Sequence, residues 1–150
     1  SEERELDWYL LAEPEHQAIQ NWVRDLLHLY KNKKAMYEAD HEFGGFEWIN
    51  ADDTYRSIFS FMRHSKDGKK NLLFVCNFTP MEHKAYKLAT PSGGRWQEIF
   101  SSDNNRYGGE GRNNKTVKQA KKAECDGQEH YISVTVPPLS ISVFKKKIGK

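Results

Sequence analysis

Side chains that could perform catalysis or hold a metal ion are sparse in this sequence. Asp52 and Asp53 form an adjacent carboxylate pair, but neighbouring side chains at a strand end point apart, and we interpret the pair as a solvated turn. The six histidines lack the spacing of a zinc site: His16, His28, His41, His64, His83 and His130. The sequence also has no GxSxG, phosphate-binding loop or GxGxxG motif. We therefore predict no catalytic residue, no metal site and no cofactor in this chain.

Two Asn-X-Thr sequons begin at Asn77 and Asn114 and would be glycosylation acceptors in a secreted protein. Asn77 lies in an apolar run that we expect to be buried, and no signal peptide precedes the first charged residues. Cys76, in the same run, has the character of a small core residue and not of a disulfide partner for Cys125. We therefore interpret both sequons as coincidental and expect a cytoplasmic protein.

Length and charge limit the classes of protein to consider. The chain has 150 residues, enough for one domain with its own core, and 23 basic against 21 acidic residues, a net charge of +2. That balance argues against a nucleic-acid binder, and no stretch approaches the roughly eighteen apolar residues of a membrane span. Lysines cluster at Lys118, Lys121 and Lys122 and at residues 145–147. We interpret these clusters as solvation of a strand edge and of the C-terminus.

Residues 71–78 are the stretch around which the fold must be organised. Five consecutive apolar residues, 72–76, are followed by Asn77 and then by Phe78. A strand with one solvated face alternates polar and apolar side chains, so this run predicts a strand that is buried on both faces. A second element must therefore cover the face that does not point into the main core.

Residues 14–33 predict one long amphipathic helix. Pro14 suits the first helical position, and Glu13 and Glu15 lie where the helix dipole favours acids. Apolar residues recur at helical spacing: Ala18, Ile19, Trp22, Val23, Leu26, Leu27, Leu29 and Tyr30. They cover an arc of about 180°, whereas a helix lying on one core needs about 100°. We expect the helix to pack one side on the domain and to leave the rest exposed or paired with a second copy.

After Gly44 and Gly45 the pattern changes to short strands separated by turns. Strands are predicted near residues 46–49, 56–63, 71–78, 84–89, 95–100, 131–136 and 139–144, with a weaker signal near 116–123. A loop rich in Asn, Asp and Gly covers residues 101–115. We predict a mainly β fold, an antiparallel β-sandwich over residues 44–150, preceded by the long helix within residues 1–43.

Several short motifs resemble a known family. In chain order they lie at residues 7–11, Pro14, His16, 22–26, 29–30, 46–49, 60–63, 77–80, Gly94, Trp96, Glu98, 102–103, 107–111 and 137–139. In these motifs the chain is similar to the C-terminal part of bacterial 1,4-α-glucan (glycogen) branching enzymes. Leu27 stands where that family usually has Asn, and the lysine-rich residues 115–122 depart from its pattern.

The resemblance implies a parent enzyme with a catalytic (β/α)8 barrel followed by a β-sandwich of the α-amylase C-terminal type. Residues 1–43 would then be the end of the barrel domain, including its last helix, and residues 44–150 the sandwich. The parent would transfer α-1,4-glucan chains to 6-hydroxyl groups by a retaining mechanism with two carboxylates. Those carboxylates lie upstream of this segment in the family, so we expect the chain alone to be inactive.

The resemblance leaves two roles open for the domain. It would be a structural domain whose partner is the catalytic barrel and which meets glycogen only through the parent, or an accessory glucan-binding module. Sugars stack on aromatic rings that lie beside polar groups, so Trp48, Trp96 and Tyr107 are candidate glucan contacts, although core packing is the favoured interpretation of each ring. A further hypothesis is an unrelated β-sandwich adaptor that binds protein.

Overall fold

The computed structural model describes residues 5–149. Residues 1–4, at the start of the predicted segment 1–43, and residue 150, at the end of the predicted segment 44–150, lie outside the described residues. A 3-10 helix, η1 (Trp8–Ala12), leads into the predicted long helix, α1 (Pro14–Asn32). Pro14 opens α1 and needs no hydrogen-bond partner there, because proline lacks the N–H group. Two further 3-10 turns, η2 (Lys34–Met36) and η3 (Phe43–Gly45), carry the chain to the first strand.

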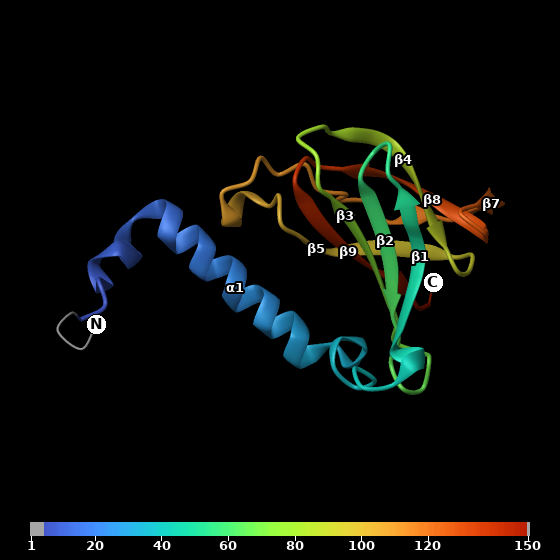
Figure 1. The fold of residues 1–150 in the computed structure, drawn as a ribbon, viewed down its shortest axis with the longest axis horizontal. Coiled ribbons are helices and arrows are strands. Elements are labelled where there is room, and N and C mark those ends of the chain that lie inside the picture. Colours follow the sequence, from blue (N-terminus) through green and yellow to red (C-terminus); the bar gives the residue numbers. More distant parts are fainter. Residues whose placement is uncertain (1–4, 150) are drawn as a thin grey trace.

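The remaining elements form two antiparallel sheets that pack face to face (Figure 1). The larger sheet has the order β1-β2-β3-β9-β5-β6 and the smaller one β4-β8-β7. The strands are β1 (Phe46–Asp53), β2 (Ile58–Arg63), β3 (Leu72–Asn77), β4 (His83–Thr90), β5 (Arg95–Ser101), β6 (Lys118–Gln119), β7 (Lys121–Cys125), β8 (Gln128–Val136) and β9 (Ser140–Lys147). The predicted fold class, a mainly β sandwich with one long helix before it, is confirmed.

Strand β3 lies between β2 and β9, and all of its residues are buried. Leu73 and Val75 face the smaller sheet and belong to the core between the two sheets. Leu72 and Phe74 point the opposite way and pack in a second cluster with residues of α1 and η2. The prediction of a strand buried on both faces is confirmed, and the element that covers its second face is α1 together with η2.

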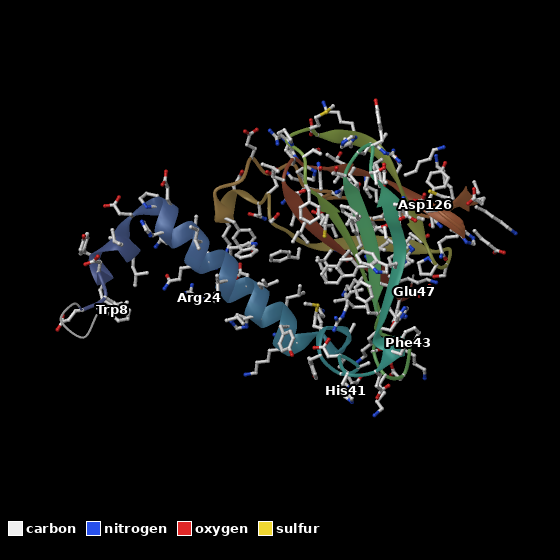
Figure 2. The ribbon with its side chains drawn as sticks, in the orientation of Figure 1. Trp8, Arg24, His41, Phe43, Glu47 and Asp126 are labelled. Carbon is white, nitrogen blue, oxygen red and sulfur yellow. The ribbon has the colours of Figure 1, made fainter. Side chains whose placement is uncertain are left out.

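Helix α1 touches the sandwich with only one of its sides. Trp22, Leu26 and Leu29 pack in the second cluster, and side chains fill the space between α1 and the strands (Figure 2). The apolar residues on the neighbouring side stay exposed, namely Ile19, Val23, Leu27 and Tyr30. The structure shows α1 packing a single side on the sandwich, and the pairing of its other side with a second copy stays a prediction.

Both sequon asparagines are structural. Asn77 is buried, donates from Nδ2 to the carbonyl oxygens of Met81 (2.8 Å) and Pro137 (2.9 Å), and accepts from the Thr79 N–H. The buried Asn114 donates from Nδ2 to a carboxylate oxygen of Glu98 at 2.7 Å. Neither amide is free to carry a glycan in this fold, which agrees with the interpretation of the sequons as coincidental.

The two lysine clusters differ in their settings. Lys118 lies on β6 and Lys121 and Lys122 on β7, and both strands are at sheet edges, as predicted. Residues 145–147 end β9, which is an interior strand between β3 and β5, and they lie close to the C-terminus as predicted. The position of a strand in the chain does not reveal where it inserts in a sheet, and the last strand here inserts near the middle.

Candidate functional site

One side of α1 presents a continuous apolar surface to solvent. Ile19, Val23, Leu27 and Tyr30 are spaced by four, four and three residues, which places them above one another on the helix. We call this set the free stripe of α1. It lies directly beside the buried side of the helix, so the helix is apolar over a wider arc than the sandwich covers.

The 3-10 helix before α1 also exposes apolar side chains. Trp8, Tyr9 and Leu11 of η1 are exposed, and Figure 2 shows Trp8 at the end of the helical segment that is far from the sandwich. Contiguous exposed apolar patches commonly mark a protein interface. We refer to the free stripe and these three residues together as the docking face.

A pair of hydrogen bonds to Asp25 fixes α1 to the loop that follows β5. Asp25 Oδ2 accepts from the Tyr107 hydroxyl at 2.7 Å and from Arg106 Nε at 2.8 Å. Tyr107 and Arg106 belong to the short helix η4 (Asn105–Tyr107). The bond from Tyr107, with the nearby Arg106, lowers the pKa of Asp25 below its ordinary 3.8 although burial opposes the change. Burial and the Asp25 carboxylate raise the pKa of Tyr107 to about 12, so its hydroxyl keeps its proton at neutral pH.

The loop that presents Tyr107 is ordered by Asp103. The Asp103 main-chain oxygen accepts from Gly111 N at 2.7 Å, and its carboxylate accepts from Arg112 N at 3.0 Å. Gly109 approaches so closely that an added Cβ would lie 2.2 Å from the Asp103 oxygen, which leaves no room for a side chain. The Tyr107 ring then packs beside Phe100, with 5.7 Å between ring centroids. Tyr107 therefore joins the sandwich to α1, and we call its bond and that of Arg106 to Asp25 the Asp25 clamp.

The structure places the three predicted aromatic contacts in three different settings. Trp96 is 2% exposed in the core between the sheets and has no free ring face. Tyr107 is half-buried, and its hydroxyl is engaged by Asp25. Trp48 on β1 is 55% exposed and lies edge-on to Phe46 and Phe61, with centroids 5.0 and 5.8 Å apart. Of the three, Trp48 is the most exposed.

The polar groups near Trp48 are largely engaged within the chain. Asn50 Oδ1 accepts from Asp52 N at 3.0 Å. Asp53 forms an ion pair with Arg56 at 2.7 Å, and its side chain is only 7% exposed. The interpretation of Asp53 as a solvated carboxylate is therefore wrong, because the Arg56 side chain folds back over it.

Other kinds of site find no support in the part of the chain that the structure describes. Within residues 5–149, no group of three His, Cys, Asp or Glu side chains could hold a metal ion. No helix in the same range is long and apolar enough to cross a membrane. The docking face is thus the surface feature of α1 that most needs a functional explanation.

Comparison with known proteins agrees with this architecture. Residues 48–147 match the family model described as "Alpha amylase, C-terminal all-beta domain". The chain belongs to this family. The match covers most of the β-sandwich, so the sandwich is related to this family. The hypothesis of an unrelated β-sandwich adaptor that binds protein therefore has no support. The division of the chain at residues 43 and 44 stays a prediction.

The curated relatives that the chain matches are longer proteins. The chain is 43% identical to a 1,4-alpha-glucan branching enzyme GlgB of Butyrivibrio fibrisolvens over 96% of its length and 22% of that protein. It is 42% identical to the enzyme of the same name from Aquifex aeolicus over 95% of its length and 23% of that protein. The chain thus spans about a fifth of the length of these relatives, and the resemblance to branching enzymes is confirmed.

A solved α-amylase from H. orenii is a more distant match. It covers 83% of this chain and 19% of its own, at 19% identity and a TM-score of 0.47.

The sequence did not predict the Asp25 clamp. Asp25 and Tyr107 are 82 positions apart, and no local pattern joins them. The position of Tyr107 in a glycine-rich loop indicated an exposed ring, and so it predicted a sugar contact and not a hydrogen bond to the helix.

We predict that Tyr107→Phe lowers the free energy of unfolding by about 1–2 kcal/mol, because a hydrogen bond to a charged carboxylate is lost. The pKa of Asp25 is lowered in the folded state, so this contribution is present above about pH 4 and is lost as pH falls through the lowered value. Denaturant unfolding of wild type and variant at pH 7 and pH 3 measures the difference, which should shrink at pH 3. Tyr55→Phe, at a tyrosine that is 97% exposed, is the matched control. A constant difference at both pH values would contradict the assignment.

Proposed function

We propose that this chain is the C-terminal domain of a 1,4-α-glucan branching enzyme, in which α1 is the last helix of the catalytic barrel and the sandwich is a structural support. The observation that carries the proposal is the docking face. A helix that is apolar on two adjacent sides, with one side already packed on the sandwich, is suited to lie between two bodies. The relatives that are similar to this chain over nearly its whole length are branching enzymes several times longer than it.

The energetics favour a partner on the docking face. Burying a large aliphatic side chain contributes roughly 1.5–3 kcal/mol, and the free stripe alone offers Ile19, Val23, Leu27 and Tyr30. The Asp25 clamp holds α1 against the sandwich, so this surface is presented without a large ordering cost. The barrel would supply the catalytic carboxylates, and the cytoplasmic location stays a prediction.

The proposal predicts that the chain binds the part of a branching enzyme that it lacks. Mixed with the B. fibrisolvens enzyme truncated before the matching segment, wild type should bind, whereas the double variant Ile19→Glu, Leu27→Glu should bind at least tenfold more weakly. That loss follows because charges would be buried in an apolar contact. Calorimetry or analytical ultracentrifugation measures the binding, and the chain alone should form no α-1,6 linkages.

The matched control for this experiment is the double variant Leu139→Glu, Ile148→Glu. It carries the same two substitutions at exposed residues outside α1 and η1. Equal weakening by both variants, or branching activity of the purified chain, would contradict the proposed structural role.

A second candidate function is a weak glucan contact at Trp48. The supporting observation is its exposed ring on β1, held in place by Phe46 and Phe61. Stacking of a ring on an aromatic side chain contributes on the order of 1–3 kcal/mol if the value for nucleic-acid bases applies. We therefore expect an affinity no tighter than about millimolar.

A titration with a linear maltooligosaccharide tests this candidate. The Trp48 indole N–H signal should shift in NMR spectra at ligand concentrations of about 10 mM, and the shift should disappear in Trp48→Leu. The buried Trp96 is the internal control, because its ring has no free face. If no indole signal moves, or only that of Trp22 moves, the domain has no glucan contact at Trp48.

A further inference from the structure

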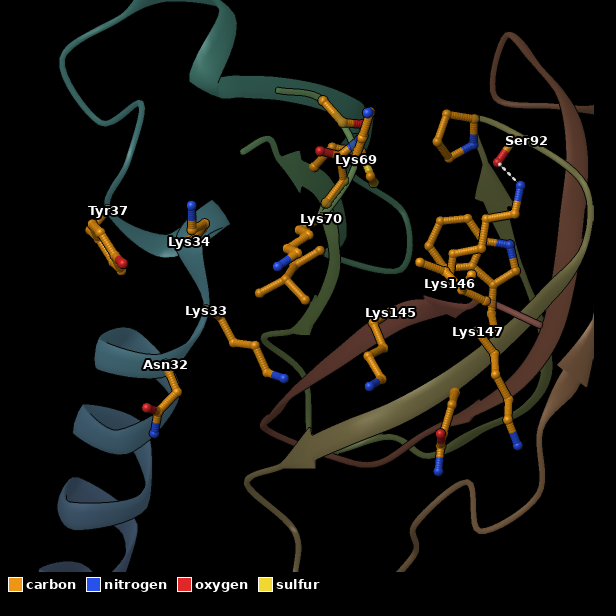
Figure 3. Close-up of a pocket in the computed structure, with 18 of the residues that line it drawn as sticks. Asn32, Lys33, Lys34, Tyr37, Lys69, Lys70, Ser92, Lys145, Lys146 and Lys147 are labelled. Atoms are coloured by element: carbon orange, nitrogen blue, oxygen red, sulfur yellow. Dashed lines mark hydrogen bonds between the residues drawn. The ribbon is translucent and has the colours of Figure 1, made fainter. Parts of the chain in front are cut away.

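A pocket of about 840 Å³ lies where the end of α1 meets the ends of several strands (Figure 3). One wall is the C-terminal end of α1 and the turn after it, and the second is the β2–β3 turn. The β4–β5 turn and the end of β9 complete it. The volume falls within the range of about 300–1,000 Å³ that is typical of small-molecule sites.

The charge of this pocket has one sign. Eight of the lining residues are lysines: Lys31, Lys33, Lys34, Lys69, Lys70 and residues 145–147. No Asp or Glu is among the lining residues that the structure describes. Figure 3 shows Lys33, Lys70 and Lys145 extending into the space between α1 and the strands from different sides. The chain as a whole is nearly neutral, with a net charge of +2, so the concentration of lysines here is local.

Few of these lysines have an acidic partner. Within residues 5–149 the ion pair formed by a lining lysine is that of Lys34 with Glu38, at 3.4 Å. Lys31, Lys33 and Lys34 suit the negative end of the α1 dipole, which accounts for part of the cluster. The dipole does not account for the lysines on the β2–β3 turn or on the interior strand β9. Like charges gathered in a concave space repel one another, and a bound anion would relieve that repulsion.

One wall is shaped around a lysine. Gly94 has a φ of +98°, and an added Cβ would lie 2.8 Å from Cε of Lys146. The absence of a side chain at Gly94 therefore lets the Lys146 stem lie against the β4–β5 turn. From there Lys146 Nζ donates to Ser92 Oγ at 3.1 Å (Figure 3).

The wall and floor also include less polar groups. Tyr37 and Ile148 are exposed lining residues, and the buried Leu72 and Trp96 lie behind the wall. The Trp96 indole N–H has no hydrogen-bond partner among the described residues. The exposed Tyr37 and Ile148 can contact an uncharged organic part of a ligand while the lysines contact its charged groups.

We propose that this pocket binds a small phosphate ester with at least two phosphate groups, such as a nucleoside diphosphate or a hexose bisphosphate. Lysine ammonium groups bind phosphate as point charges, and several of them converging from three elements suit more than one phosphate. The concave shape and the mixed lining favour a small ester over an extended polymer. This inference does not rest on the branching-enzyme proposal, so the two can fail separately.

Binding of ADP, fructose 1,6-bisphosphate and sodium tripolyphosphate to the whole chain tests the inference, with ionic strength held constant by NaCl. Calorimetry gives the affinity, and the Trp96 indole signal in NMR spectra reports occupancy of the pocket. We expect one of the two esters to saturate with a Kd of about 100 μM or tighter and to shift the Trp96 signal. The triple variant Lys33→Gln, Lys70→Gln, Lys145→Gln should weaken binding at least tenfold.

The matched control is Lys115→Gln, Lys121→Gln, Lys122→Gln, which removes the same charge from exposed lysines outside the pocket. It should change the Kd less than twofold, and an unchanged unfolding transition confirms that each variant is folded. Absence of saturation by both esters would overturn the proposal. Equal weakening by the two variants would also overturn it, as would tighter binding of a short DNA duplex than of either ester. Equal weakening or tighter DNA binding would show that anions bind to diffuse positive charge on the surface and not in a pocket for a small ligand.

Discussion

Strand β3 is apolar on both faces, and most of the structure depends on how those two faces are covered. Leu73 and Val75 are covered by the smaller sheet, which makes the sandwich. Leu72 and Phe74 are covered by α1 and η2, which brings the helix onto the outside of the larger sheet. Exposure of a Leu or Phe of this kind would cost roughly 1.5–3 kcal/mol each, so the helix and the sandwich are coupled through this one strand.

The coupling gives α1 two duties. Its buried side completes the environment of β3, and the Asp25 bonds to Tyr107 and Arg106 fix the helix against the loop after β5. With that side fixed, the free stripe is held outward as an apolar surface available to a second body. The C-terminal end of the same helix brings its lysines to those of β9 and the β2–β3 turn. The docking face and the lysine pocket thus both depend on how α1 packs against the larger sheet.

Features with a local or periodic signal were predictable from the sequence. The unbroken apolar run of β3, the helical spacing of α1 and the turns between strands predicted the sandwich and its helix, and the excess apolar arc of α1 predicted an exposed side. Features that depend on contacts distant in sequence were not. The bond between Asp25 and Tyr107 and the interior place of β9 both depend on which segments become neighbours. The lysine pocket escaped for the same reason, because its walls come from segments that lie more than a hundred residues apart.

The central claim is that α1 is held on one side only and covers β3 without being part of the sandwich core. Amide hydrogen exchange of the monomeric chain tests it most directly, because exchange reports the free energy of local opening. The account predicts that amides in the middle of α1 exchange at least tenfold faster than those of β3, through detachment of the helix from an intact sandwich. Equal protection of α1 and β3, at the level of global unfolding, would contradict it.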